Sequence, residues 1–566
     1  MKNKSYSLFS PEPISSIKEL MEKAVQEAGD KTAFRFRQGK QDCSVTFREF
    51  EQQTCFLGTA LAGLGLKEDH IAILSENRYE WICCYLTVLK SSGVFVPIDK
   101  ELPVGDIINV INDSESKAVF YSGKYEQALM EHADQLPQIR YFIGIDREEN
   151  SSDGKFLSYR LLMEQGEKRY LEGDRSYTEQ TSDPQKMKLL VYTSGTTGMA
   201  KGVMLSEHNL VSSVYYGLQV STIYDRGLSV LPYNHTYEAV SGILVSIHHH
   251  STVCINDSLK NIAKNMVYYQ PDYIYLVPAF VELFYKKIWA NAKKTGAEGK
   301  LRLMIKVSNG LRKIGIDLRR TFFSSIHSVF GGHLRKLVCG GAPIRPELGE
   351  FFDAIGISLT NGYGITECSP LVSVNRDDFN DCSTVGIPLP CCQIKIQDPD
   401  EDGIGEICVK GDVVMLGYFK KPEQTAQVLT PDGWFSTGDY GTINEKGQLV
   451  ITGRKKNLIV LDNGKNIFPE EIENLISAID YVTEVVVYGH QNQAGLEDAL
   501  YAEIYCSPEA LAASGVTEPQ QQLKQDIAAA CHELPSYKRI SKIILREQEF
   551  EKTTTNKIKR NTVVKQ

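Results

Sequence analysis

Glycine, serine and threonine residues are concentrated in one segment that directly follows an apolar run. The run Leu189–Val191 predicts a buried strand, and the eleven residues after it include three glycines and four Ser or Thr residues. Backbone N–H groups in such a loop bind phosphate oxygens, and Lys201 adds a cation. Two residues separate this lysine from the preceding glycine, so the loop is not a Walker A sequence. The segment indicates polyphosphate binding, although its composition also suits a flexible surface loop. The residues predicted to bind the polyphosphate are Thr193, Ser194, Gly195, Thr196, Thr197, Gly198 and Lys201.

This loop closely resembles the phosphate-binding signature of the adenylate-forming enzymes. That superfamily includes acyl-CoA synthetases, nonribosomal-peptide adenylation domains and firefly luciferase. Further motifs of the superfamily follow in the expected order, so the resemblance extends from about residue 30 to the C-terminus. It implies that the protein uses ATP and Mg²⁺ to activate a carboxylic acid, with Thr196 among the metal ligands.

Two glycine-containing motifs are similar to the nucleotide-binding segments of the superfamily. The first, Gly341, Ala342 and Pro343, follows a predicted strand and resembles the segment along the adenine edge. The second resembles the core nucleotide motif and consists of Asn361, Gly362, Tyr363, Gly364, Ile365, Thr366 and Glu367. Tyr363 has an aromatic face suited to adenine, Thr366 a hydroxyl for phosphate, and Glu367 hard oxygen ligands for Mg²⁺. Outside such a motif, Tyr363 would suit ordinary packing and Glu367 would be an exposed acid.

The resemblance assigns the ribose contacts and a hinge to the last quarter of the chain. Asp439 corresponds to the residue that binds the ribose hydroxyls, and a carboxylate can accept hydrogen bonds from both. An isolated Asp after glycine would otherwise cap a loop. Arg454 corresponds to a second ribose contact, and Lys456 to the hinge about which the C-terminal domain rotates between half-reactions. The segment Gly464–Glu473 resembles the one that borders the thiol channel.

Lys557 matches the C-terminal lysine that the superfamily uses for adenylation. A cation there offsets the repulsion between an attacking carboxylate and the α-phosphate. The sequence departs from the usual pattern, because Asn556 stands where glycine is common and Glu551 where proline is common. Asparagine tolerates a positive φ better than other non-glycine residues, so the loop conformation is still accessible.

His235 lies in a Pro-x-x-His-x-x-Glu pattern within Leu231–Glu238 that resembles fatty-acyl and long-chain members of the superfamily. The resemblance places His235 near the acyl site. Contact with the carboxylate, gating of the pocket and support of the Mg²⁺–phosphate geometry are all compatible with it. A lone histidine in apolar surroundings can equally be a hydrogen-bonded core residue.

The elements that must position these residues follow an α/β pattern. Helical periodicity over Ile17–Val25 precedes short apolar runs that alternate with helical stretches, which predicts stacked α/β layers with largely parallel sheets. After about Cys391, short strands with Gly and Asp turns predict a small antiparallel β element. We therefore predict a large N-terminal domain over residues 1–453 and a small, mobile α+β domain over residues 454–566. The predicted buried strands are Ile71–Leu74, Ala118–Tyr121, Arg140–Ile145, Lys188–Tyr192, Tyr273–Val277 and Leu334–Cys339.

Composition excludes several classes of protein. The 566 residues carry a net charge of −9, which argues against a generally basic nucleic-acid-binding surface. The 13 cysteines include no CxxC pair, so they indicate reduced thiols in the cytoplasm. We expect no secretion signal and no integral membrane segment, because the apolar runs are about half the length that spans a bilayer. Peripheral contact with a membrane is left open.

The sequence thus predicts ATP-dependent activation of a medium- or long-chain fatty acid to an acyl-adenylate, with release of pyrophosphate. Transfer to coenzyme A then gives acyl-CoA and AMP. One alternative keeps the first step but passes the acyl group to an acyl-carrier protein. A second is a degenerate protein that binds a nucleotide without turnover.

Overall fold

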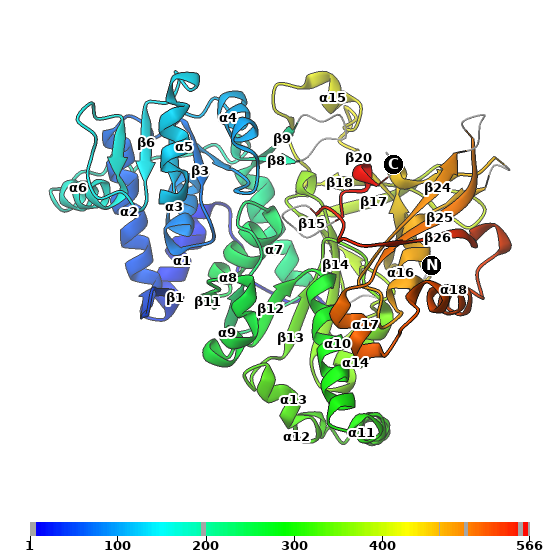
Figure 1. Ribbon diagram of the computed structural model, residues 1–566. Helices are drawn as coiled ribbons and strands as arrows, with labels where there is room; N and C mark the ends of the chain where they lie inside the picture. Colours follow the sequence, from blue (N-terminus) through cyan, green and yellow to red (C-terminus); the bar gives the residue numbers. More distant parts are fainter. Residues whose placement is uncertain (1–6, 194–199, 463–464, 492–495, 553–557, 564–566) are drawn as a thin grey trace.

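The computed structural model describes residues 7–193, 200–462, 465–491, 496–552 and 558–563. The N-terminal part of the chain forms two large, mostly parallel sheets with helices packed against them, and the C-terminal part forms a smaller α+β unit (Figure 1). The α/β class predicted from the sequence is therefore confirmed. Among the described residues, no helix is long and apolar enough to cross a membrane.

The first sheet has eight strands and ends in the hairpin that flanks the predicted phosphate loop. Its inner strands pair in parallel, whereas β8 and β9 are antiparallel. In spatial order the strands are β19 (Gly417–Tyr418), β9 (Lys201–Ser206), β8 (Met187–Thr193), β4 (Val94–Pro97), β3 (His70–Leu74), β5 (Ala118–Tyr121), β6 (Tyr141–Gly144) and β7 (Phe156–Ser158). The helices that follow these strands along the chain are α3 (Tyr79–Lys90), α4 (Val104–Asp113), α5 (Glu126–Glu131) and α6 (Tyr159–Leu171).

The second sheet has nine strands, and five consecutive parallel pairings form its centre. In spatial order the strands are β16 (Ile387–Pro388), β15 (Leu371–Val374), β14 (Ser358–Gly364), β13 (Lys336–Cys339), β12 (Tyr273–Leu276), β10 (Arg226–Ser229), β11 (Thr252–Ile255), β1 (Thr32–Gln38) and β2 (Gln41–Thr46). Further helices of this part are α1 (Ile17–Ala28), α2 (Phe47–Gly63), α7 (Glu207–Val220), α8 (Val245–His248), α9 (Ile262–Tyr269), α14 (Pro346–Ala354) and the π-helix η3 (Tyr237–Leu244).

One hydrophobic core joins the layers. Helix α3 is buried over almost its whole circumference. The aromatic rings of Trp81, Tyr85 and Phe95 contact one another, with each pair of ring centroids 5.1 Å apart. A helix apolar on all sides must be enclosed by other elements. The central strands are buried on both faces, which explains why they read as continuous apolar runs rather than alternating ones.

Helices α10 (Pro278–Lys294), α11 (Glu298–Arg312), α12 (Arg319–Phe322) and α13 (Ser324–Val329) lie between β12 and β13 in the sequence. In Figure 1 they form a helical protrusion at the lower end of the molecule. The strand predicted at Tyr273–Val277 ends one residue earlier, because Pro278 begins α10.

The rest of the chain is built from shorter elements. The turn pattern predicts a small antiparallel sheet, and the structure has one with four strands: β17 (Cys392–Gln397), β18 (Gly405–Gly411), β20 (Phe435–Ile443) and β21 (Leu449–Arg454). Helix α15 (Pro422–Ala426) packs beside β19. Beyond it lie β22 (Ile459–Val460), β23 (Asn466–Ile467), β24 (Glu484–Gln491), β25 (Glu497–Tyr505) and β26 (Ile540–Arg546), with α16 (Pro469–Ser477), α17 (Pro508–Ser514) and α18 (Pro519–Ala530). The last group has a hydrophobic core of its own.

Candidate active site

Asp439 is the centre of a polar cluster that joins three strands. Tyr363 of β14 donates a hydrogen bond of 2.7 Å from its hydroxyl to Asp439 Oδ2, and Arg454 Nε lies 3.0 Å from Oδ1. Strand register explains the second contact, because Asp439 of β20 pairs directly with Arg454 of β21. Burial, with Asp439 beside it, raises the pKa of Tyr363 well above its usual value, so the hydroxyl stays protonated and donates. The structure brings these three predicted residues together.

Glu367 lies in a second polar cluster, at the end of the first sheet. Tyr418 donates from its hydroxyl to Glu367 Oε1 at 3.0 Å, and Lys201 Nζ lies 4.9 Å from the centre of the same ring. Strand β19 adds Tyr418 to the edge of the hairpin in which Thr193 pairs with Lys201. Glu367 is half-buried, as is the neighbouring Thr366. The sequence analysis missed Tyr418, because a single tyrosine after a glycine carries no spacing signal.

The residues at Glu367 fit a magnesium ion that is shared with a bound polyphosphate. No group of three or more His, Cys, Asp or Glu side chains in the described part of the chain is arranged to hold a metal by itself. Mg²⁺ usually keeps several waters and is bound by one or two carboxylates together with substrate phosphates. A single half-buried carboxylate beside a lysine and a glycine-rich hairpin suits that coordination.

The glycine motifs follow the carboxyl ends of neighbouring parallel strands. Asn361 pairs with Cys339 across β13 and β14, and Gly340 and Gly341 follow directly after β13. Gly341 has a φ of +84°, a conformation that favours glycine. In open α/β sheets, ligands bind beyond the carboxyl ends of the strands. Gly341, Ala342 and Pro343 are exposed at this edge, and Gly362 and Gly364 are half-buried in β14.

Asn361 has an unused hydrogen-bond acceptor at the same edge. Its side chain is buried and its Nδ2 lies 3.4 Å from the carbonyl oxygen of Thr384. Its Oδ1 has no hydrogen-bond partner among the described residues. Buried polar atoms of this kind are uncommon in proteins and often mark a place where a ligand or water binds.

His235 is half-buried at the start of the π-helix η3, and its backbone carbonyl accepts hydrogen bonds from Glu238 and Ala239. The same helix contacts the nucleotide-motif strands, because Tyr237 donates to the carbonyl of Val338 at 3.0 Å. A Cβ added to Gly340 would lie 3.2 Å from the Tyr237 ring. The His235 motif is therefore adjacent to the predicted adenine-edge segment.

Glu238, the last residue of the His235 motif, is a buried acid that the sequence analysis did not single out. Ser229 donates to its Oε1 at 2.5 Å, while Oε2 has no hydrogen-bond partner within the described ranges. Burial raises the pKa of Glu238 to about 8. Gly242 leaves room for this carboxyl, because a Cβ there would lie 2.7 Å from Glu238 Cδ. π-Helical turns are rare and often occur at functional sites.

Lys456 is exposed in a short 3-10 turn after β21. Its neighbours hold the turn at both sides, because Lys455 forms an ion pair of 2.7 Å with Glu406 and Asn457 donates to Glu470 at 2.6 Å. The remaining predicted site residues, Ser194, Gly195, Thr196, Thr197, Gly198 and Lys557, lie outside the described residues.

Solved structures with low sequence identity share this fold over nearly the whole chain. An anthranilate CoA ligase in complex with anthranoyl-AMP has a TM-score of 0.77 and 19% identity, covering 100% of this chain and 98% of that one. The adenylation domain of a carboxylate reductase from Mycobacterium chelonae has a TM-score of 0.81 and 19% identity, and the match covers 98% of this chain and 90% of that one. These likenesses show that the fold is shared over nearly the whole chain. Among the described residues, the structure joins Tyr363, Asp439 and Arg454.

A family described as AMP-binding enzyme matches residues 21–419, and one described as AMP-binding enzyme C-terminal domain matches residues 456–566. The chain belongs to the AMP-binding enzyme family. Similar proteins include long-chain-fatty-acid–CoA ligase 6 of Mus musculus, with 28% identity over 88% of this chain and 75% of that protein. The long-chain-fatty-acid–CoA ligase FadD15 of Mycobacterium bovis is 29% identical over 79% of this chain and 75% of that protein. A chloroplastic long-chain-fatty-acid–[acyl-carrier-protein] ligase of Arabidopsis thaliana is 27% identical over 84% of this chain and 75% of that protein.

Proposed function

We propose that the protein is an AMP-forming ligase that joins a medium- or long-chain fatty acid to the thiol of coenzyme A. Membership in the AMP-binding enzyme family supports the use of ATP, and the names of the similar long-chain-fatty-acid–CoA ligases support the two substrates. The observation that carries the proposal is the cluster in which Tyr363, near the carboxyl end of β14, and Arg454 orient Asp439.

The nucleotide would bind across these strand ends. Asp439 has lone pairs left to accept the ribose hydroxyls, since a carboxylate offers about four acceptor positions and two are occupied. Asn361 Oδ1 is suited to accept a hydrogen bond from the amino group of adenine, and the backbone at Gly341 can approach the ring closely. Thr366, Lys201 and the loop Thr193–Gly198 would bind the phosphates.

The chemistry requires no protein nucleophile. A carboxylate oxygen of the acid attacks the α-phosphorus of ATP, and pyrophosphate leaves with the electrons of the broken P–O bond. The thiol sulfur then attacks the acyl carbon, its proton is lost, and AMP leaves. Mg²⁺, held by Glu367 and Thr196 together with the phosphates, would neutralise phosphate charge. Lys557 would stabilise the charge that develops between the carboxylate and the α-phosphate.

We infer that the two steps use different positions of residues 454–566, with Lys456 as the hinge. His235 would lie at the acyl side of the site, because its motif contacts the strand β13 that leads to Gly341. An acyl-carrier protein is the second candidate for the thiol acceptor, since one similar protein carries that name. A nucleotide-binding protein without turnover is the least favoured alternative, because Glu367 and Asp439 are intact.

The proposal is tested by acid-dependent exchange between ATP and labelled pyrophosphate, followed by thioester formation. Fatty acids of graded chain length should support exchange, and thioester should form with free coenzyme A. Thioester formation only with holo-acyl-carrier protein would select the second acceptor. Absence of exchange with every acid would reject the enzyme.

Lys557→Ala separates the two half-reactions. The variant should lose adenylation while it still converts supplied acyl-adenylate to thioester, because the lysine acts only at the phosphate. Lys559→Ala, two residues away, is the matched control and should keep both steps. Equal loss of both steps in Lys557→Ala would contradict the assigned role.

A further inference from the structure

The helical protrusion formed by α10–α13 differs in charge from the rest of the molecule. Residues 278–330 contain eleven Lys and Arg residues and three acidic residues, a net charge of +8, in a chain whose net charge is −9. The remainder of the protein is therefore strongly acidic, and the positive charge is concentrated at one end. None of the residues placed in the active site lies in this segment.

Most of this positive charge is available to a partner. Six lysines of the protrusion form no ion pair with any described residue. These lysines are Lys287, Lys293, Lys294, Lys300, Lys306 and Lys313, and all six are exposed.

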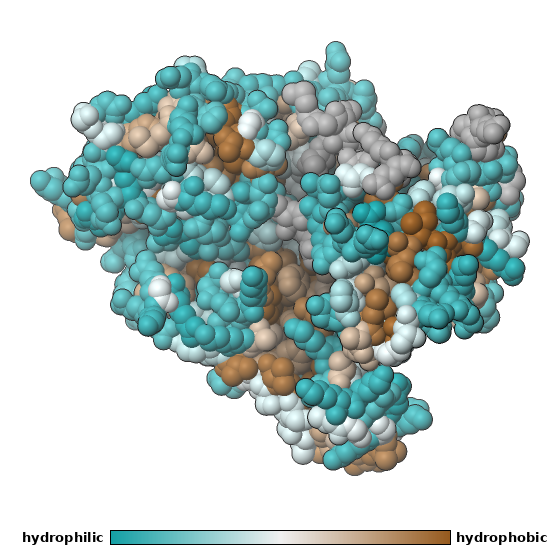
Figure 2. Space-filling model, in the orientation of Figure 1, coloured by the Kyte–Doolittle hydropathy of each residue, from teal (hydrophilic) through white to brown (hydrophobic). Residues whose placement is uncertain are grey.

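The same segment exposes an unusual share of large apolar side chains. Leu303 is 61% exposed, Val307 45% and Ile314 72%. Of the eighteen large hydrophobic residues that are exposed in the described part of the chain, seven lie between residues 283 and 329. The seven are Leu283, Leu303, Val307, Ile314, Ile316, Leu318 and Val329. Figure 2 shows hydrophobic surface at the lower tip of the molecule, over α11 and next to hydrophilic surface.

Exposed apolar residues and lysines lie on the same side of helix α11. Leu303 and Val307 are four residues apart and therefore lie on the same face of the helix. Lys300 and Lys306 are each about 60° from Leu303 around the helix, one on either side, since each residue turns by about 100°. Apolar residues flanked by lysines are typical of helices that lie in the interface of a bilayer, with the lysines at the level of the headgroups.

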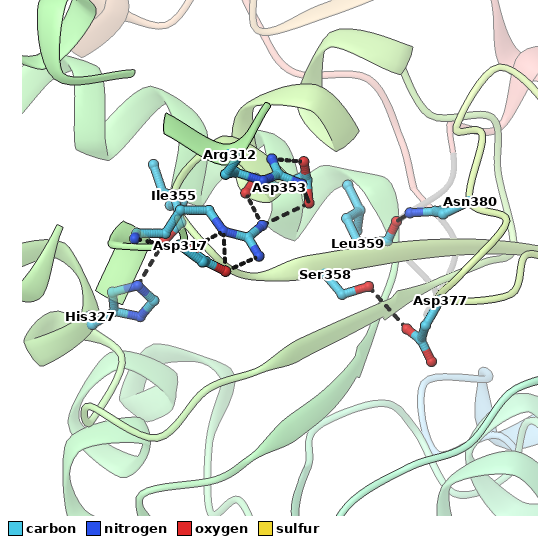
Figure 3. A network of polar contacts seen from close by, with 10 residues as sticks. Arg312, Asp317, His327, Asp353, Ile355, Ser358, Leu359, Asp377 and Asn380 are labelled. Atoms are coloured by element: carbon cyan, nitrogen blue, oxygen red, sulfur yellow. Dashed lines mark hydrogen bonds and ion pairs between the residues drawn. The ribbon is translucent and has the colours of Figure 1, made fainter. Parts of the chain in front are cut away.

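The protrusion is fixed to the core by its other charged residues. Arg312 forms an ion pair of 2.6 Å with Asp353 of α14, and Arg319 pairs with both Asp317 and Asp353. His327 Nε2 donates to the carbonyl of Ile355 at 2.8 Å. Figure 3 shows this network, which joins the C-terminal end of α11 and the residues that follow it to α14. The exposed lysines and apolar residues of α11 take no part in it, so they can be changed without loss of this anchor.

We propose that the tip of the protrusion, α11 with residues 313–318, docks on the surface of an anionic lipid bilayer. Negative headgroups complement the unpaired lysines, and the apolar side chains enter the boundary between headgroups and acyl chains. A convex tip with separate apolar side chains suits a lipid surface better than a protein pocket. An acidic carrier protein is disfavoured because its thiol must reach the nucleotide site, whereas Figure 1 places α11 at the opposite end of the molecule from β18 and β20.

The test is flotation of the full-length protein with vesicles of phosphatidylcholine alone or mixed with phosphatidylglycerol. The unmodified protein should bind the mixed vesicles and lose binding near 1 M salt, where the Debye length is about 3 Å. Lys300→Gln/Lys306→Gln/Lys313→Gln should weaken this binding about 100-fold, at the usual contribution of each lysine near an anionic surface. Leu303→Gln/Val307→Gln/Ile314→Gln should weaken it about tenfold.

Matched controls change exposed lysines or exposed apolar residues elsewhere. Lys40→Gln/Lys186→Gln/Lys524→Gln and Met130→Gln/Leu171→Gln alter exposed residues outside the protrusion and should bind vesicles as the unmodified protein does. Equal binding to neutral and mixed vesicles, or unchanged binding in both tip variants, would overturn the proposal. The proposal would also be overturned if the unmodified protein binds no vesicles and the tip variants lose capture by holo-acyl-carrier protein. Because flotation needs no turnover, its result is independent of the proposed ligase activity.

Discussion

At the scale of single residues, the site depends on acids whose surroundings differ. Asp439 is 3% exposed and has a hydrogen-bond donor at each oxygen, so its position is fixed before a ligand arrives. Glu238 is 1% exposed, its donors among the described residues are a hydroxyl and a backbone group, and burial raises its pKa to about 8. The first acid is therefore held in place to accept hydrogen bonds from a diol, whereas the second is suited to remain protonated near neutral pH.

Asp439→Asn should weaken ATP binding about 10- to 100-fold, because hydrogen bonds to a charged group contribute about 1.5–3 kcal/mol. Calorimetric titration with ATP measures the change. Tyr363→Phe is the matched comparison and should lose less, since it keeps the ring and the carboxylate and removes one orienting hydroxyl. Unchanged affinity in Asp439→Asn would remove Asp439 from the nucleotide site.

Glu238 should make the stability of the fold depend on pH. Its folded pKa of about 8 lies above the ordinary value of 4.5, so the folded state holds a proton that the unfolded state releases. The contribution of Glu238 to stability is therefore fully present below pH 4.5 and falls by about 1.4 kcal/mol per pH unit as the pH rises towards 8. Glu238→Gln should flatten this slope, and urea unfolding at pH 5, 6.5 and 8 measures the change.

An exposed glutamate gives the control for this experiment. Glu423→Gln in α15 should leave the pH dependence of the unfolding midpoint as it is, because that side chain is exposed in the folded state. If Glu238→Gln and the unmodified protein lose stability equally between pH 5 and 8, Glu238 is not protonated in the folded state.

At the scale of elements, a short turn connects the strand that carries Arg454 to the C-terminal unit. The 3-10 turn Lys455–Asn457 leads from β21, which carries Arg454, into the C-terminal unit. Ion pairs and hydrogen bonds hold the residues on both sides of Lys456, whereas Lys456 itself is exposed. A turn with one unrestrained position between two held ones is suited to act as a hinge.

Lys456→Pro should therefore impair thioester formation more than adenylation, because proline fixes φ at the hinge. Single-turnover measurements of the two half-reactions give the comparison. Lys456→Ala is the control, since it removes the charge but leaves the backbone free, and it should retain both rates. Unchanged overall turnover in Lys456→Pro would argue against rotation about this residue.

At the scale of the whole molecule, a contact between α10 and the loop before β24 joins the N-terminal part to the C-terminal unit. Lys286 Nζ donates to the carbonyl of Val482 at 2.9 Å, and burial lowers the pKa of this lysine. A polar group removed from water in this way is costly unless its hydrogen bond is kept. The contact therefore stabilises the arrangement of the two parts seen here.

Lys286→Met should loosen that arrangement while it preserves the apolar stem of the side chain. Hydrogen exchange should become faster in the backbone amides of residues 480–484, because local opening exposes them more often. Lys287→Met, at the exposed neighbouring position, is the control and should exchange like the unmodified protein. Equal exchange in Lys286→Met and its control would show that the contact does not hold the two parts together.

The sequence by itself determined the α/β class, most strand positions and the motif residues around Tyr363 and Asp439. Apolar runs and glycine spacing are local properties, and they can be read without knowing which strands are neighbours. Only the tertiary structure decided that Tyr418 reaches Glu367, that Glu238 is enclosed without a charged partner among the described residues, and that the exposed lysines of α11 remain uncovered at one end of the molecule. These outcomes depend on which elements pack against one another and which surfaces stay uncovered, and no local pattern encodes that packing.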